Sequence, residues 1–462
     1  MVGPKYRQPS TPVPAEFKEQ PPESFKESDG WKRSQPADQA LRGKWWELFG
    51  DSKLNELEEQ VTISNQDLKV AEARFREARA MIRFNRASQF PTISVGPSVS
   101  SLRDSAHRPF FASSSSPTGD FVLPFDLSYE LDVWGRVRRT VAAAREEAQA
   151  SAADLETVRL SLHAELAFDY LELRAADAEK QLLDDTVKAY VDGLKLTTNR
   201  YEGGAAPRSD VEQAKTQLAS TQAQDTDVGV QRAQFEHAIA VLAGKPPADL
   251  SIPPAPLDTQ PPIVPIGLPS QLLERRPDVA ASERRVAEAN EQIGIARAAF
   301  FPTLMLGASA GLEGTSLLNW FNWPSRFWAV GPSMVQTLFD AGRRRATSDA
   351  ALASYDASVA NYRETALTAF QQVEDNLAAL RILEQESKEQ REAVAAAEES
   401  LRIFTNRYKG GIDTYLQVIT AQTATLTNQR TEVDIRRRRM EASVLLIKAL
   451  GGGWDKTSLP KF

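Results

Sequence analysis

The residue types that most often perform catalysis are scarce in this chain of 462 residues. It contains no cysteine, which excludes disulfides, thiol catalysis and thiolate metal ligands. Its three histidines, His107, His163 and His237, stand far apart in the sequence without clustered metal ligands beside them. There is no glycine-rich phosphate loop and no nucleophile elbow. We therefore expect no enzyme, no metal site and no cofactor.

Other polar residues stand close to a hexapeptide that occurs twice. NRYEGG covers residues 199–204 and NRYKGG covers residues 406–411, an offset of 207 residues. Asp210 follows the first copy and Asp413 the second. Their carboxylates could attract cations, but each also has a structural explanation. Asp413 suits the N-cap of a helix, and Asp210 lies in the first turn after Pro207, where the helix dipole favours an acid.

The sequence around each hexapeptide repeats as well, which indicates an internal duplication. VWGRVRR at 133–139 matches DAGRRR at 340–345, and QFPTISVG at 89–96 matches FFPTLMLG at 300–307. Each half predicts the same order of elements: a helix, two strands, a long helix, a Gly-Gly turn and a second long helix. The offset is too long for a solenoid, whose repeats span roughly 20 to 50 residues.

Two extended segments are predicted in each half, and one alternates between apolar and polar residues from Phe125 onward. In residues 121–133 the odd positions are apolar, whereas Asp126, Glu130 and Asp132 lie on the opposite face. This period of two is typical of a strand with one apolar and one wet face. The segments have about the length of a bilayer-crossing strand, roughly 9 to 11 residues, although the alternation alone also fits a soluble sheet. The loop between the last two strands suits either a membrane-interface girdle or a small buried aromatic cluster, since it carries Trp320, Phe321 and Trp323.

Two very long helices are the strongest physical feature of the sequence. Residues 137–201 contain no proline and a single glycine, Gly193, and residues 343–408 contain neither. Apolar residues recur at spacings of three and four, as the seam of a coiled coil requires. At about 1.5 Å per residue each stretch spans roughly 100 Å. The Gly-Gly turns then mark the tips of two helical hairpins, at Gly203, Gly204, Gly410 and Gly411.

The composition argues against several other classes of protein. The net charge is −7, from 62 acidic and 55 basic residues, so no basic excess predicts a nucleic-acid partner. No apolar run approaches the roughly 18 residues that a transmembrane helix needs. No signal peptide precedes the abrupt start MVGPKY, and we expect one to have been removed from the native chain.

Over nearly the whole chain, these landmarks resemble the TolC-like outer-membrane factor family, in its lipoprotein branch of RND multidrug-efflux exit ducts. The tandem pairing of the motifs makes the resemblance specific. The matching motifs are VGPKY at 2–6, WWELFGDSKLNEL at 45–57, SYELDVWGRVR at 128–138, NRYEGG, RRPDVAASE at 275–283, IGIARAAFFPTL at 293–304, NRYKGG and KALGGG at 448–453.

The resemblance implies an α+β membrane protein that assembles as a homotrimer. Four strands per chain would form one twelve-stranded transmembrane β-barrel, continued by a long periplasmic α-helical barrel. Asp126, Glu130 and Asp132 would line the barrel lumen. A physical argument agrees on one point: even eight strands enclose a lumen filled by side chains, so an open duct needs strands from more than one chain. The implied location is the outer membrane of a Gram-negative bacterium, in contact with its lipid, with a large periplasmic part.

The function implied by the resemblance is that of an exit duct in a tripartite efflux pump. Such a duct passively conducts drugs and other small molecules to the exterior from a periplasmic adaptor (membrane fusion) protein and an inner-membrane RND-type transporter. A type I secretion exit duct and a soluble coiled-coil scaffold with a small β-cap are the alternatives. Dependence on detergent separates the scaffold from either duct.

In the family, tyrosines and rings of aspartate at the hairpin tips constrict the periplasmic end. Asp210 matches a ring position, but its counterpart in the second half is Gln417 and the next carboxylate position falls on Thr420. Asp413 is the nearby acid that could substitute. The four tip glycines would contact the adaptor. The residues assigned to this periplasmic gate are Tyr201, Arg208, Asp210, Tyr408, Asp413 and Gln417.

In the family an acylated cysteine precedes a VGPxY-like start, and Met1 stands beside that place here. Two arginine clusters, at Arg136, Arg138 and Arg139 and at 343–345, could meet lipid phosphates or form ordinary solvated helix; 436–439 is expected to be solvated helix rather than an interaction patch.

Five regions are expected along the chain. They are 1–60, an extended Pro-rich segment and short helix; 61–250, the first repeat; 251–270, a Pro-rich linker or equatorial belt; 271–453, the second repeat; and 454–462, a tail.

Overall fold

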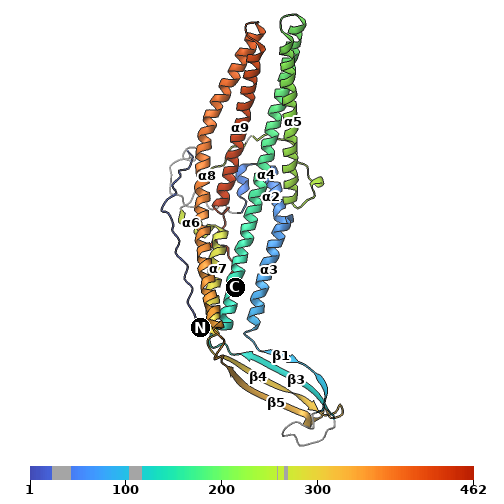
Figure 1. Ribbon diagram of the computed structural model, residues 1–462, viewed down its shortest axis with the longest axis vertical. Coiled ribbons are helices and arrows are strands. Elements are labelled where there is room, and N and C mark those ends of the chain that lie inside the picture. Colours follow the sequence, from blue (N-terminus) through green and yellow to red (C-terminus); the bar gives the residue numbers. More distant parts are fainter. Residues whose placement is uncertain (23–42, 104–116, 258, 265–268) are drawn as a thin grey trace.

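The computed structural model describes an elongated molecule, in which a long helical body carries a curved β-sheet at one end (Figure 1). His107, the loop at 104–116 and parts of the Pro-rich segments lie outside the described residues. Those described are 1–22, 43–103, 117–257, 259–264 and 269–462.

Four long helices form two antiparallel hairpins. Helix α4 (Arg136–Glu202) and helix α8 (Arg343–Lys409) each have 67 residues, and each returns through a helix of 35 residues, α5 (Arg208–Leu242) or α9 (Tyr415–Ala449). The two long helices predicted from the sequence are therefore confirmed to within about one residue. Their lengths correspond to roughly 100 Å. The small side chains along α4, such as Ala148 and Ala153, are fully buried, which allows close approach of its neighbours.

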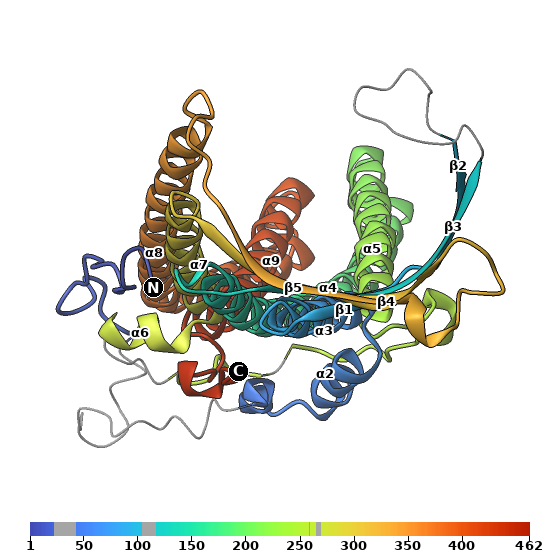
Figure 2. The same ribbon diagram turned by 90° about the horizontal axis from the view of Figure 1, so that it is seen from below.

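Shorter helices thicken the half of the body that lies nearer the sheet. Helix α3 (Gln66–Ala87) and helix α7 (Pro277–Ala298) flank the first part of α4, while α2 (Ser52–Ser64) and α6 (Pro269–Arg275) lie on the convex side of the helical layer (Figure 2). Helix starts follow local rules. The Asp51 carboxylate accepts the N–H groups of Lys53 and Leu54 at the start of α2, and Asn65 accepts that of Leu68 at the start of α3.

Within the described residues the sheet contains five antiparallel strand segments, where the sequence predicted four strands. The first predicted strand is broken at Gly96–Pro97, whereas the last strand of the sheet, Arg326–Val335, continues through the same pair at Gly331–Pro332. The two pieces of the first strand pair with successive parts of the same neighbour. The segments are β1 (Thr92–Val95), β2 (Ser98–Leu102), β3 (Thr118–Glu130), β4 (Thr303–Gly314) and β5 (Arg326–Val335), in the order β1-β3-β4-β5 with β2 also on β3.

The register of the sheet brings its apolar residues to one face. Phe125 on β3 lies opposite Val95 on β1 and Ala310 on β4, and Ala310 lies opposite Trp328 on β5. Directly opposed residues point to the same side of a sheet. Phe125 and Trp328 are exposed in the single chain. The adjacent row on the other face is Ser94, Asp126, Ser309 and Ala329.

The two chain ends are fastened to the helical body. The N-terminal segment makes a backbone bond from the Val2 N–H to the Trp134 carbonyl at 2.9 Å, and Tyr6 donates a hydrogen bond to the buried carboxylate of Glu283. At the other end, Lys456 pairs with Glu283 at 3.3 Å. One buried carboxylate thus ties both ends of the chain to α7.

Candidate functional site at the hairpin tips and the sheet

The two hairpin tips lie at the end of the body opposite the sheet (Figure 1). Gly204 and Gly411 have φ angles of +73° and +74°, a left-handed conformation that a Cβ atom disfavours. The Gly204 N–H bonds to the Tyr201 carbonyl at 2.9 Å, and the Gly411 N–H bonds to the Tyr408 carbonyl at 3.0 Å. The repeated hexapeptide therefore encodes the same helix-ending turn twice.

The tyrosines of the two hexapeptides occupy different environments. Tyr408 is 3% exposed and packs against Tyr415, with ring centroids 5.2 Å apart, whereas Tyr201 is 43% exposed. Ala214 from α5 belongs to the same buried cluster as Tyr408. The ring of Tyr408 therefore helps to hold the two hairpins together, and Tyr201 remains at the surface of its tip.

Arg200 connects the tips, and sequence reasoning did not single it out. Its guanidinium carbon lies 4.7 Å from the centroid of the Tyr408 ring, and its Nη1 donates to the Lys409 carbonyl at 3.0 Å. Arg208, which the family resemblance assigned to the gate, has a side chain that is 77% exposed. Its Nε lies 3.7 Å from Glu212 Oε1 of its own helix. The sequence feature that could have identified Arg200 is its position inside the repeated hexapeptide.

The two candidate acids also differ. Asp413 is not the N-cap of α9: Thr414 holds that place, and the Asp413 carboxylate pairs with Arg407 at 2.5 Å. The expected cap was wrong because this arginine, four residues before Gly411, reaches across the turn. Asp210 lies in the first turn of α5, where burial raises the pKa of its carboxyl and the charge of Arg200 opposes that rise. Gln417 is exposed near the start of α9.

The three predicted lumen acids lie along one end of β3 and beyond it. Asp126 is exposed on the polar face, and Glu130 pairs with Arg136 at the end of the strand. β3 ends at Glu130, so Asp132 is not a strand residue as predicted. Its carboxylate accepts the N–H groups of Val137 and Arg138 at 3.1 and 2.9 Å, which draws the chain into the first turn of α4.

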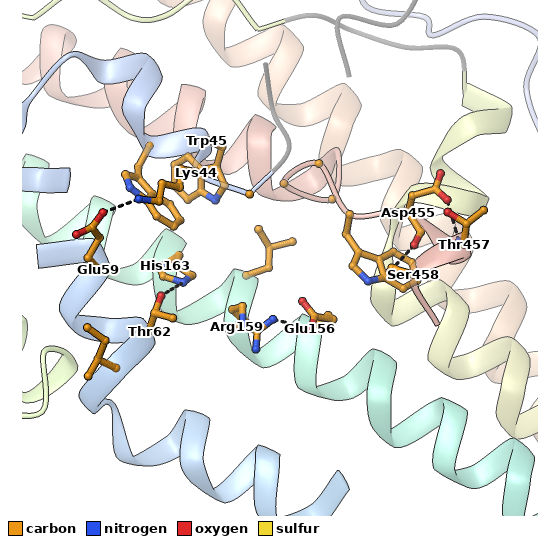
Figure 3. Close-up of a pocket in the computed structure, with 18 residues that line it drawn as sticks. Lys44, Trp45, Glu59, Thr62, Glu156, Arg159, His163, Asp455, Thr457 and Ser458 are labelled. Atoms are coloured by element: carbon orange, nitrogen blue, oxygen red, sulfur yellow. Dashed lines mark hydrogen bonds and ion pairs between the residues drawn. The ribbon is translucent and has the colours of Figure 1, made fainter. Parts of the chain in front are cut away.

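A pocket of about 850 Å³ opens between α2, α4 and the glycines after α9 (Figure 3). His163 lies on its wall, with Nδ1 2.6 Å from Glu58 Oε2 and its ring stacked on Trp46. Burial lowers the pKa of His163 to about 4 and raises that of Glu58. These groups stabilise the packing of α2 on α4. Other charges in the pocket are paired locally, as Lys44 with Glu59 and Arg159 with Glu156.

The run of four arginines in α9 does not form one patch. Arg436 donates to the Leu257 carbonyl at 3.0 Å, whereas Arg437 pairs with Glu172 and Glu441. Within the described part of the chain, no helix is both long and apolar enough to span a membrane. The same residues contain no cluster of three or more His, Cys, Asp or Glu side chains that could hold a metal ion.

Comparison with known proteins places both halves of the chain in one family. The sequence profile described as "Outer membrane efflux protein" matches residues 57–245 and 268–452. The probable efflux pump outer membrane protein TtgC of Pseudomonas putida is 34% identical over 455 residues, which cover 98% of this chain and 92% of TtgC. The pyoverdine export outer membrane protein OpmQ of Pseudomonas aeruginosa is 32% identical over 417 residues, covering 89% and 88%.

The fold is also similar to that of solved structures. The outer-membrane channel OprN superposes with a TM-score of 0.89 at 29% identity, over 98% of this chain and 99% of that chain. The agreement extends through the sheet and the helical body. With paired hairpins, a two-faced sheet and sequence matches over both halves, this chain belongs to the outer membrane efflux protein family.

Proposed function

We propose that this chain, as a homotrimer, forms the outer-membrane exit duct of a tripartite efflux pump. The observation that carries the proposal is the sheet, which has one apolar and one polar face and joins a helical body roughly 100 Å long. Strands of 13, 12 and 10 residues are long enough to cross a bilayer. The duct conducts passively, without catalysis.

Closure of the barrel explains the two edges of the sheet. Among the described strands, β5 pairs only with β4, and β1 and β2 pair only with β3. An open edge invites pairing with another chain. Three copies joined edge to edge give twelve strands, if β1 and β2 count as one broken strand. Asp126 and Glu130 then line the lumen, and Asp132 lies at its periplasmic mouth.

Aromatic side chains at both ends of the sheet support this placement. Trp320 packs on Phe121 at one end, where Trp323 is 74% exposed, and Trp134 stacks on Phe301 at the other end. Aromatic rings gather at both interfaces of transmembrane barrels. The exposure of Trp323 favours the girdle over a buried aromatic cluster.

At the opposite end, the tips form the gate and the docking surface for a periplasmic adaptor, which links the duct to an RND-type transporter in the inner membrane. Tyr408, Arg200 and Asp210 hold the tips closed, while Tyr201 and Gln417 lie at the surface. The two halves represent an internal duplication, and the described part of the segment 251–270 forms a belt around the mid-body. Efflux is favoured over type I secretion because TtgC is named for an efflux pump and OpmQ for pyoverdine export.

Light scattering with detergent correction tests the assembly. We expect three chains per particle, and we expect discrete channels after insertion into planar lipid bilayers. A stable monomer without detergent would support the soluble scaffold instead. A trimer that never conducts would contradict the duct.

A further inference from the structure

We propose that a cationic pocket beside the first turns of α4 binds the phosphate headgroup of an anionic phospholipid. The pocket has a volume of about 420 Å³, within the usual range of ligand sites, roughly 300 to 1,000 Å³. Its cations come from the N-terminal segment and from α4, namely Lys5, Arg138, Arg139 and Arg145.

The pocket lies where helix meets sheet. α4 begins at Arg136, six residues after the end of β3, and Gln89, just before β1, forms another wall. Figure 1 shows the N-terminus at this junction. With the sheet inserted in the outer membrane, which rests on the proposed function, this level is the periplasmic surface of the lipid. Lipid phosphates are concentrated there.

The pocket has more positive than negative charge. Arg139 is 5% exposed. It forms an ion pair with Glu291 at 2.8 Å and donates a hydrogen bond to the Pro4 carbonyl at 3.1 Å. Arg138 is half-exposed and pairs with Asp132 at 3.1 Å. Four cations thus face two carboxylates. Among the described residues neither Lys5 nor Arg145 has an ion-pair partner, so both side chains are available to a phosphate.

The arrangement on the helix suits a headgroup. Arg138 and Arg145 are seven residues apart, two helical turns or roughly 10 Å, and therefore lie on the same side of α4. Val141 and Ala142 lie between them and form an apolar floor. Guanidinium groups bind phosphate oxygens in a bidentate manner.

The second half of the chain lacks this arrangement of side chains at the equivalent positions of α8. The residues 207 positions later are Arg345 for Arg138, Asp349 for Ala142 and Leu352 for Arg145. The second half therefore has an acid and a leucine where the pocket has its floor and its second arginine. Arg345 provides a matched control for non-specific attraction between a basic helix start and an anionic lipid.

The test uses the full chain in a neutral detergent, with bound lipids counted by native mass spectrometry. Dioctanoyl phosphatidylglycerol and dioctanoyl phosphatidylcholine are the probes. We expect phosphatidylglycerol to bind more tightly, and Arg145→Ala or Lys5→Ala each to weaken it by about tenfold, the loss of one charge-assisted contact. Arg345→Ala should leave the affinity unchanged. Lys5 lies on an extended segment, so its variant remains informative if Arg145→Ala does not assemble.

Equal binding of the two lipids, or unchanged phosphatidylglycerol affinity in both pocket variants, would overturn the proposal. Inorganic phosphate distinguishes the two sources of the ligand. If it displaces phosphatidylglycerol at equal concentration, the site is one for free phosphate and the lipid assignment is wrong. Trimer mass and conductance are recorded on the same samples, so a duct that conducts without this lipid preference contradicts only the pocket.

Discussion

The guanidinium carbon of Arg200 lies 4.7 Å from the centroid of the Tyr408 ring, and the two residues belong to different hairpins. The same guanidinium donates to the Lys409 carbonyl at 3.0 Å. Arg407, the counterpart of Arg200 in the second hexapeptide, instead pairs with Asp413 inside its own tip. Arg200 thus fastens one hairpin to the other, and Arg407 stabilises a single turn.

Removal of the Arg200 side chain should loosen the proposed gate. A cation–π contact of this kind contributes roughly 1 kcal/mol, so Arg200→Ala should raise the ratio of open to closed channels by about fivefold. Single-channel recording in planar bilayers measures this ratio. Arg208→Ala is the control, because that side chain is 77% exposed and its ion pair is with Glu212 of its own helix. An equal change of the open-to-closed ratio in the two variants would show that the contact between Arg200 and Tyr408 does not stabilise the closed state.

Asp210 should give the tip its cation preference and a dependence on pH. Burial raises the pKa of its carboxyl above the usual value, and the three carboxylates of a trimer would raise it further by repulsion. Protonation as the pH falls through this raised pKa removes the negative charges, so cation preference should decline on acidification. Reversal potentials in a salt gradient measure it. The Asp210→Asn variant should have a low cation preference at every pH. If the variant instead keeps the wild-type dependence of cation preference on pH, Asp210 serves only as a helix-start residue.

Two glycines before the long helices should differ in their tolerance of alanine. Gly135 and Gly342 have φ angles of +88° and +85°, so alanine costs roughly 1 to 2 kcal/mol of strain at either position. A Cβ at Gly135 would also lie 2.4 Å from Met1 Cγ, whereas nothing lies within 4 Å at Gly342. Gly135→Ala should therefore lower the unfolding temperature more, and should speed hydrogen exchange at Val2. Equal exchange at Val2 in the two variants would contradict the contact with Met1.

Asp169 should destabilise the body at neutral pH. Burial, together with Glu165 and Glu172, raises the pKa of its carboxyl from 3.8 to about 6 in the folded chain. Stability is lost as the pH rises from 3.8 to 6, because the unfolded chain releases the proton first. The full shift corresponds to at most about 3 kcal/mol, and screening by solvent reduces this to roughly 1 kcal/mol.

Asp169→Asn should accordingly raise the apparent unfolding temperature at pH 7.5, and this gain should vanish near pH 3.5. Asp185→Asn is the matched control on the same helix. Its carboxylate is exposed and pairs with Lys188 at 2.9 Å, and a hydrogen bond from Gln181 lowers its pKa, so no gain is expected. A gain in the Asp169 variant that persists at low pH would have another cause.

Patterns along the chain predicted the elements well and their partners poorly. The run without Gly or Pro from Arg343 to Tyr408 predicted a helix, and α8 ends one residue later at Lys409. The prediction succeeds because a helix depends on neighbours three and four residues away. The alternation in β3 was equally local, but it overran the strand, since Asp132 bonds to the N–H groups of α4. The break at Gly96–Pro97 was not predicted, and the proline alone does not explain it, because β5 continues through the same pair at Gly331–Pro332.

By itself the sequence determined the two halves, the long helices, the turns at the glycine pairs and the two faces of the sheet, because each of these depends on spacing within one segment. Tertiary structure decided which of two equivalent residues in the hexapeptides is buried or makes a contact between the hairpins. Tyr408 is buried and Tyr201 exposed, and Arg200 crosses between hairpins where Arg407 does not. The two hexapeptides differ only at Glu202 and Lys409, so their arginines and tyrosines carry no local signal of that difference. It arises from the packing of α4 against α9, which brings Arg200 at the tip of α4 to the ring of Tyr408, about 200 positions away in the sequence.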